Sequence, residues 1–131
     1  MTYNPLNLEE ARVILEQGTE VPFQGEYDQL FQDGTYICRQ CNNPLFDATA
    51  KFDAGCGWPA FDDYIADAVK QIPDKDGRRI EIRCAACQGH LGHVFIGEKM
   101  TDKNIRHCVN SISTRFIPRE ESLPTLLQPG V

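Results

Sequence analysis

Apolar residues follow a helical spacing only near the start of the chain. Asn7 followed three residues later by Glu10 is typical of a helix cap, and Gly18 is typical of a helix end. We therefore predict a short helix at about residues 7–18. The apolar face of this helix would consist of Leu8, Ala11, Ile14 and Leu15.

Most of the remaining chain has the pattern of short β-strands. Apolar and charged residues alternate from Ile80 to Arg83, and the turn pair Asp33-Gly34 precedes a β-type run at 35–37. We expect further extended segments at 45–52, 90–96 and 105–117, a loop at 55–59, and a loose tail at about 121–131. The pattern thus predicts a mainly β fold with antiparallel strands.

Length and composition exclude several classes of protein. The 131 residues are expected to form one domain. No apolar stretch approaches the roughly 20 residues that span a bilayer, and the N-terminus MTYNPLNLEE has neither the basic stretch nor the apolar run of a secretory signal. We therefore expect a cytoplasmic protein that does not associate with membranes.

The net charge argues against a nucleic-acid partner. The formal charge is −6 with all cysteines counted as neutral. Four thiolates around one divalent cation would make the chain two units more negative. Such a field repels a phosphate backbone, which disfavours the nucleic-acid role that zinc ribbons often have.

Four of the six cysteines have the spacing of a metal site. They form two C-x-x-C knuckles, and the two-residue spacer lets both thiolates of a knuckle reach one tetrahedral ion. Structural disulfides, or a redox dithiol at one knuckle, are the alternatives, and disulfides are less expected in a chain without a secretory signal. We expect one structural Zn²⁺ per chain, although four sulfurs also accommodate iron. The predicted ligands are Cys38, Cys41, Cys84 and Cys87.

The other two cysteines, Cys56 and Cys108, are candidates for chemistry. On a strand, Arg106, Cys108 and Asn110 share one face, and a nearby guanidinium favours the thiolate, which is the nucleophile. The alternative is a cysteine that is only a small buried hydrophobe. Cys56 lies in a glycine-flanked loop that can move its sulfur towards a second cysteine sulfur. The nearby Trp58 offers an aromatic wall for a thioether or methyl group. The alternative is that Trp58 is an ordinary core residue.

Two histidines follow the second knuckle. His90 and His93 are available as proton donors or acceptors, because four thiolates already complete a tetrahedral zinc shell. Each of them taken alone is more often structural than catalytic.

These segments together resemble the B-type methionine sulfoxide reductases, which act on the R epimer of methionine sulfoxide. The resemblance extends from Cys38 to Phe116, and it departs from the common pattern at Ala54, Ala60 and His107. The matching segments are the two knuckles, Gly55-Cys56-Gly57-Trp58-Pro59-Ala60-Phe61, His90-Leu91-Gly92-His93-Val94-Phe95 and Arg106-His107-Cys108-Val109-Asn110-Ser111.

The resemblance implies a fold and a role for each site residue. The fold would be a single zinc-containing reductase domain over residues 1–131 with two antiparallel β-sheets. Cys108 would be the nucleophile and Cys56 the resolving cysteine. Trp58 and Phe95 would bind the substrate. The residues that would organise the sulfoxide oxygen and its protonation are His90, His93 and Asn110, with Arg106 beside them.

The implied reaction is reduction of methionine (R)-sulfoxide, free or in oxidised proteins, as a repair function. Cys108 would become a sulfenic acid and then form a disulfide with Cys56, which thioredoxin would reduce. A monomer is expected. The competing hypothesis is a zinc-stabilised β domain that binds a peptide or small ligand in an aromatic cleft without catalysis, which leaves Cys56 and Cys108 unexplained.

Overall fold

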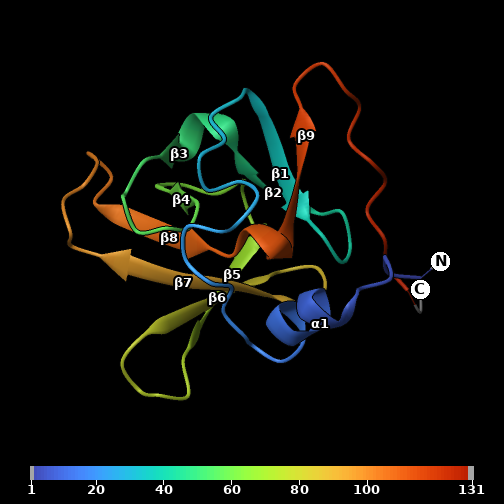
Figure 1. The fold of residues 1–131 in the computed structure, drawn as a ribbon, viewed down its shortest axis with the longest axis horizontal. Helices are drawn as coiled ribbons and strands as arrows, with labels where there is room; N and C mark the ends of the chain where they lie inside the picture. Colours follow the sequence, from blue (N-terminus) through green and yellow to red (C-terminus); the bar gives the residue numbers. More distant parts are fainter. Residues whose placement is uncertain (1, 130–131) are drawn as a thin grey trace.

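A computed structural model describes residues 2–129, and in this range the chain forms one short α-helix and two antiparallel sheets (Figure 1). This confirms the predicted mainly β fold. The three-stranded sheet has the order β2-β1-β9, with β1 at Gly34–Cys38, β2 at Pro44–Asp47 and β9 at Thr114–Pro118. The six-stranded sheet has the order β3-β4-β8-β7-β6-β5, with β3 at Lys51–Phe52, β4 at Ala60–Phe61, β5 at Val69–Pro73, β6 at Ile80–Cys84, β7 at His90–Ile96 and β8 at Ile105–Val109.

The helix α1 spans Leu8–Ile14 and is shorter than the predicted 7–18. Its start is as predicted, because the Asn7 side chain accepts from Glu10 N and the Glu10 side chain accepts from Asn7 N. The predicted apolar face is wrong at its ends: Leu8 is 91% exposed and Leu15 is 60% exposed. Ile14 is buried as predicted, and Val13 is buried in addition, because α1 packs against β7 and the 3₁₀ turn η2 (Ser111–Ser113). No helix among residues 2–129 is long and apolar enough to cross a membrane.

Two segments that the sequence predicts as single extended runs are each divided between the two sheets. The run at 45–52 becomes β2 and β3, separated by the 3₁₀ turn η1 (Ala48–Ala50), where the Asp47 side chain accepts from Thr49 N at 3.0 Å. The run at 105–117 becomes β8 and β9, separated by η2. Each turn therefore passes the chain from one sheet to the other.

Aromatic side chains from both sheets form the core. Tyr36 of β1 packs edge-on against Phe61 of β4 with ring centroids 5.1 Å apart, and Phe46 of β2 stacks on Phe61 at 4.4 Å. His107 of β8 is buried beside them, with Nδ1 3.0 Å from the Phe61 carbonyl oxygen. His107 therefore points into the core, so its neighbour Cys108 points to the other face of the sheet, as the alternation predicted.

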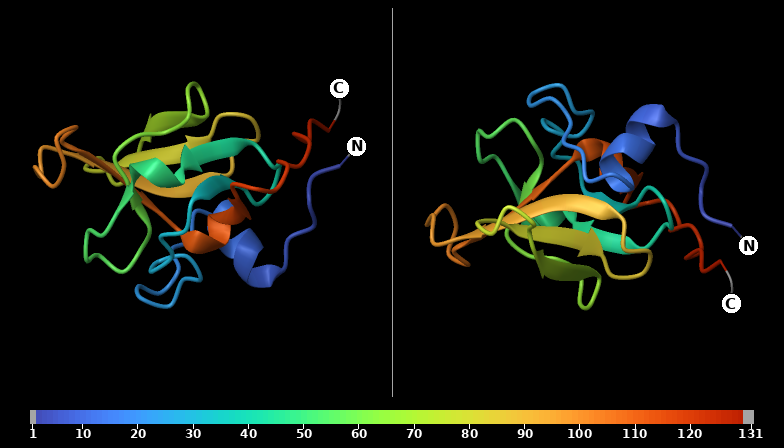
Figure 2. Two further views of the ribbon diagram at one scale, coloured as in Figure 1. Left: turned by 90° about the horizontal axis from the view of Figure 1, so that it is seen from above. Right: turned by 90° about the horizontal axis from the view of Figure 1, so that it is seen from below.

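Both terminal segments run beside the first cysteine knuckle, as the two views of Figure 2 show. Asn4 N donates to Gln40 O at 2.9 Å, and Leu127 N donates to Cys41 O at 2.8 Å. The predicted tail, 121–131, has no helix or strand in its described part, up to residue 129. It is less loose than predicted, because this hydrogen bond and the packing of Leu127 against the core fix its path.

Candidate active site and metal centre

The sulfurs of Cys38, Cys41, Cys84 and Cys87, called here the cysteine quartet, all lie within 4.8 Å of one another. The Cys38 and Cys87 sulfurs are 3.6 Å apart, and the Cys41 and Cys84 sulfurs are 3.5 Å apart. An ion bound tetrahedrally at about 2.3 Å from each sulfur requires sulfur separations of about 3.8 Å. The quartet therefore fits one four-coordinate metal ion, as the spacing predicted.

Both knuckles have the same backbone turn. Asn42 and Gln88 each follow the second cysteine of a knuckle, with φ of 70° and 67°. Their N–H groups donate back to the carbonyls of Cys38 and Cys84 at 2.9 and 2.8 Å. The first knuckle joins β1 to β2 and the second joins β6 to β7, so a bound ion would connect the two sheets.

A pocket of about 90 Å³ opens beside Cys108. The strand register places Cys108 of β8 opposite His93 of β7, and Trp58 enters from the loop before β4. Gly92 is required at this crossing, because a Cβ there would lie 1.9 Å from the Cys108 carbonyl oxygen. The predicted residues that line the pocket are Trp58, His93, Phe95, Cys108 and Asn110.

The thiols of Cys56 and Cys108, called here the redox pair, interact with each other. The pKa of Cys56 is lowered to about 6, first by its hydrogen bond with Cys108 and further by its Trp58 backbone contact and the charge of Arg106. The pKa of Cys108 is raised, first by the hydrogen bond with Cys56 and then by burial. The pair therefore holds one proton between its two sulfurs near neutral pH.

Arg106 supplies a positive charge beside the redox pair. Its side chain donates to both carboxylate oxygens of Glu98, at 2.8 and 3.2 Å, and lies 4.4 Å from the centre of the Phe95 ring. This double contact fixes the guanidinium. The charge of Arg106 favours the thiolate at Cys56 and at Cys108 alike.

The two predicted histidines lie in different surroundings. His93 lines the pocket, and its Nε2 is 2.6 Å from Asp74 Oδ2. His90 is only 2% exposed, and its Nδ1 is 2.7 Å from Glu81 Oε2. Burial lowers the pKa of His90, despite Glu81. His93 is therefore the histidine that can reach a molecule in the pocket, and His90 is a buried neighbour with its ring centre 5.6 Å away.

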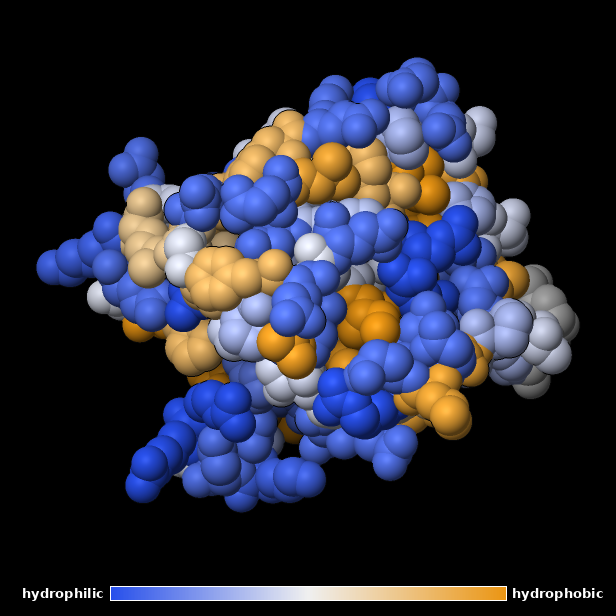
Figure 3. Space-filling view, in the orientation of Figure 1, coloured by the Kyte–Doolittle hydropathy of each residue, from blue (hydrophilic) through white to orange (hydrophobic). Residues whose placement is uncertain are grey.

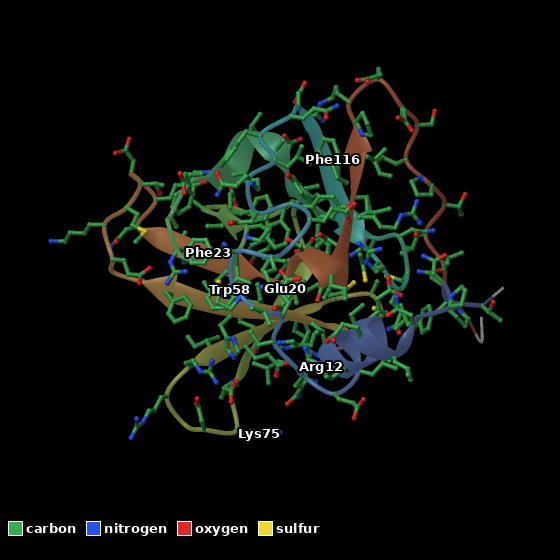
Figure 4. All side chains as sticks on the ribbon, in the orientation of Figure 1. Arg12, Glu20, Phe23, Trp58, Lys75 and Phe116 are labelled. Atoms are coloured by element: carbon green, nitrogen blue, oxygen red, sulfur yellow. The ribbon has the colours of Figure 1, made fainter. Side chains whose placement is uncertain are left out.

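Glu20 is a residue of the site that the sequence did not reveal. Its carbonyl accepts from Trp58 Nε1 at 3.0 Å, and its N–H donates to Asn110 Oδ1 at 2.9 Å. Its carboxylate accepts from the N–H groups of Ser111 and Ile112 at 2.5 and 3.2 Å. Figure 4 shows Glu20 and Trp58 close together at the front of the molecule. Glu20 therefore positions two walls of the pocket.

Sequence reasoning also missed the acidic partners of the site. Asp74 lies in the turn between β5 and β6 and contacts His93, 19 residues further along the chain. Glu81 lies on β6 and contacts His90, 9 residues further along. Glu98 lies in the β7–β8 turn. The alternation around Glu81 indicated a strand, but the sequence did not show that the Glu81 side chain is buried and contacts His90.

The chain matches the SelR domain over residues 6–118. It is 55% identical over 119 residues to peptide methionine sulfoxide reductase B2, chloroplastic, of Arabidopsis thaliana, covering 90% of this chain and 59% of that relative. It is 53% identical over 114 residues to peptide methionine sulfoxide reductase B5 of Oryza sativa subsp. japonica, covering 86% of this chain and 84% of that relative.

A second chloroplastic relative, reductase B3 of Oryza sativa subsp. japonica, is 55% identical over 117 residues, covering 88% of this chain and 51% of that relative. This chain therefore spans about half to three fifths of the two chloroplastic relatives. The match extends beyond the motifs to the helix and to the segment that carries Glu20. The resemblance predicted from the motifs is confirmed: this protein belongs to the SelR domain family.

Proposed function

We propose that this protein reduces methionine (R)-sulfoxide to methionine, acting as a peptide-methionine (R)-S-oxide reductase in the repair of oxidised proteins. The observation that carries the proposal is the redox pair, in which Cys108 lines a pocket and the pKa of each thiol is shifted by the other thiol and by Arg106. The relatives named above are peptide methionine sulfoxide reductases, which supports the same reaction.

The first step is transfer of the sulfoxide oxygen to Cys108. With these pKa shifts the resting proton of the pair lies on Cys108, so this proton must pass to Cys56 before Cys108, which lines the pocket, can attack as a thiolate. The Cys108 thiolate attacks the sulfoxide sulfur while one proton is added to the oxygen, and His93 is the residue placed to deliver it. The protonated oxygen is then transferred to the Cys108 sulfur: a Cys108 S–O bond forms, the S–O bond of the substrate and the transient S–S bond break, methionine leaves, and Cys108 becomes a sulfenic acid.

The second step forms the disulfide. The Cys56 thiol attacks the sulfur of the Cys108 sulfenic acid, an S–S bond forms, and the oxygen leaves as water. Cys56 is suited to this step because it lies in a loop with positive φ at Gly55 and Gly57, and a Cβ on Gly55 would meet nothing within 4 Å. A dithiol reductant of the thioredoxin class then reduces the disulfide by exchange and restores both thiols.

The walls of the pocket suit the end of a methionine sulfoxide side chain. A volume of about 90 Å³ holds a methylsulfinyl group but not a drug-sized ligand, which needs roughly 300–1,000 Å³. Trp58 and Phe95 offer aromatic surfaces to the methyl and sulfur. The Asn110 side chain is held in place because its Oδ1 accepts from Glu20 N and its Nδ2 donates to Leu91 O at 3.0 Å. Asn110 would therefore contribute a fixed wall near the sulfoxide oxygen.

We also propose that the cysteine quartet holds one Zn²⁺ with a structural role. Four thiolates suit zinc, which adds no redox chemistry of its own. Within the second knuckle, Gly89 N also donates a hydrogen bond to the Cys87 sulfur at 3.4 Å. Metal analysis of the purified protein should give one zinc per chain. A monomeric state and a cytosolic location remain predictions from sequence.

The direct test is incubation with racemic methionine sulfoxide and dithiothreitol. We expect methionine to accumulate until half of the sulfoxide is consumed, with the S epimer left. Chiral analysis of the remaining sulfoxide measures this outcome. Binding of methionine sulfoxide without any methionine formed would instead support the non-catalytic β domain.

A further inference from the structure

Phe23 combines a strained backbone with an exposed aromatic ring. Its φ is 67°, in the left-handed region that large side chains rarely adopt, and its side chain is 67% exposed. Its N–H donates to Gly57 O at 2.7 Å, which fixes this conformation. Such strain persists only where the surrounding structure enforces it, and it is concentrated at functional sites.

The loop that carries the redox cysteine is shaped to receive this ring. Gly57 has φ of 89°, and a Cβ on it would lie 2.9 Å from Phe23 ring atoms and 2.7 Å from Pro22. The Phe23 ring therefore lies over Gly57, the residue between Cys56 and Trp58. Figure 4 shows the labelled Phe23, Trp58 and Glu20 grouped at the front of the molecule.

The segment that holds Phe23 is attached on both sides of the pocket. Glu20 connects it to Trp58 and to Asn110, and a Cβ on Gly25 would lie 2.5 Å from Ser111 Oγ. Thr19 at the start of the segment lines the pocket itself. The backbone of Phe23 is thus held in place relative to the reacting sulfur.

A peptide substrate must lie over this rim. The pocket of about 90 Å³ takes only the end of one side chain, so the residues next to methionine sulfoxide remain outside it. The exposed large apolar side chains of this segment are Phe23 and Val21, the latter 57% exposed, and the exposed Pro22 lies between them. In the orientation of Figure 4, Figure 3 shows apolar patches within a polar surface on this face.

We propose that Phe23 forms a subsite for an apolar side chain next to methionine sulfoxide in a peptide. The inference rests on the proposed function and specifies its substrate class: extended or unfolded segments in which the oxidised methionine has an apolar neighbour. Free methionine sulfoxide has no neighbouring side chain to occupy the subsite. Covering an exposed phenyl ring with a leucine side chain is expected to change kcat/KM roughly tenfold.

The test compares two blocked peptides with dithiothreitol as reductant, one with leucine and one with glycine next to methionine (R)-sulfoxide. The measured quantity is the ratio of kcat/KM for the leucine peptide to that for the glycine peptide. Phe23→Asn removes the ring with a residue that tolerates the left-handed conformation. We expect this substitution to lower the ratio roughly tenfold and Phe23→Tyr, which keeps the ring, to restore it.

Leu8→Ala is the matched control, because Leu8 is 91% exposed and lies on α1. It should leave the ratio unchanged. A ratio that stays the same in Phe23→Asn, at an unchanged melting temperature, overturns the inference. So does a loss seen only in thioredoxin-dependent turnover, which would assign the ring to the reductant. If the wild type reduces neither peptide nor free methionine sulfoxide, the proposed function itself fails.

Discussion

The cysteine quartet and the redox pair use the same side chain in opposite surroundings. The quartet sulfurs come from two tight turns of equal geometry, and three of the four residues are buried. The redox pair comes from a strand and a glycine-flanked loop, and both residues are only partly buried. Enclosure by other thiols therefore favours metal binding, whereas a single thiol neighbour beside an open pocket favours electron exchange.

The two regions also differ in what supports them. The quartet lies where both sheets meet, so its metal would carry stability for the whole domain. The redox pair is supported by side chains such as Glu20 and Arg106, which fix the geometry of the pocket and the charge around it. Substitutions in the first region should thus affect folding, and those in the second should affect chemistry.

The largest effect is expected from Cys84→Ser. Loss of one ligand removes the structural ion, which can supply on the order of 10 kcal/mol to folding, comparable to the roughly 5–15 kcal/mol net stability of a domain. We expect loss of bound metal and an unfolded or strongly destabilised chain, measured by metal analysis and thermal melting. Cys56→Ser is the control and should retain both. Retained metal and an unchanged melting temperature in Cys84→Ser would refute the structural role.

Substitutions in the redox pair should separate two steps of one reaction. Cys108→Ser should abolish sulfoxide reduction, because no other sulfur of residues 2–129 lines the pocket. Cys56→Ser should still form about one methionine per enzyme and then stop when thioredoxin is the reductant. A quench experiment with limiting enzyme measures this single turnover. Normal cycling of Cys56→Ser with thioredoxin would show that Cys56 is not the resolving cysteine.

The two histidines should separate chemistry from stability. His93→Asn is expected to lower kcat by roughly 10²–10⁴-fold, the usual range for a lost proton donor, with little change in melting temperature. His90→Asn should mainly destabilise the fold, because Glu81 is 3% exposed and would lose a hydrogen-bond partner. Steady-state rates and thermal melts distinguish the two. A large loss of kcat in His90→Asn at an unchanged melting temperature would assign the proton to His90 instead.

The sequence predicted the parts of the site that depend on local pattern. The knuckle spacing was sufficient for the quartet, and the alternation along β8 correctly separated His107 from Cys108. Both rest on geometry that a few consecutive residues determine, either a tight turn or a two-residue strand period.

What the sequence could not predict depends on contacts between distant segments. The carboxylate of Glu20 accepts from Ser111 N across 91 positions, and nothing near Glu20 indicates this partner. The division of 45–52 between two sheets also involves a distant contact, because Phe46 of β2 packs against Phe61 of β4. The intrinsic preference of a segment for a strand has less influence than packing wherever a buried contact with a distant segment determines the fold.

The smallest expected effect concerns the acidity of the redox pair. Thiolate forms as the pH rises through the pKa, so alkylation of Cys56 by iodoacetamide in the reduced protein should increase with pH, reach half of its maximum near pH 6, and level off at higher pH. Cys108→Ala removes the largest cause of this low pKa, the hydrogen bond with Cys108, and the plateau should move to higher pH. Mass spectrometry of the Cys56 peptide measures the rates. An unchanged plateau in Cys108→Ala would mean that the Trp58 backbone contact and the charge of Arg106, rather than the partner thiol, set the acidity of Cys56, and the pair would then titrate as two independent thiols.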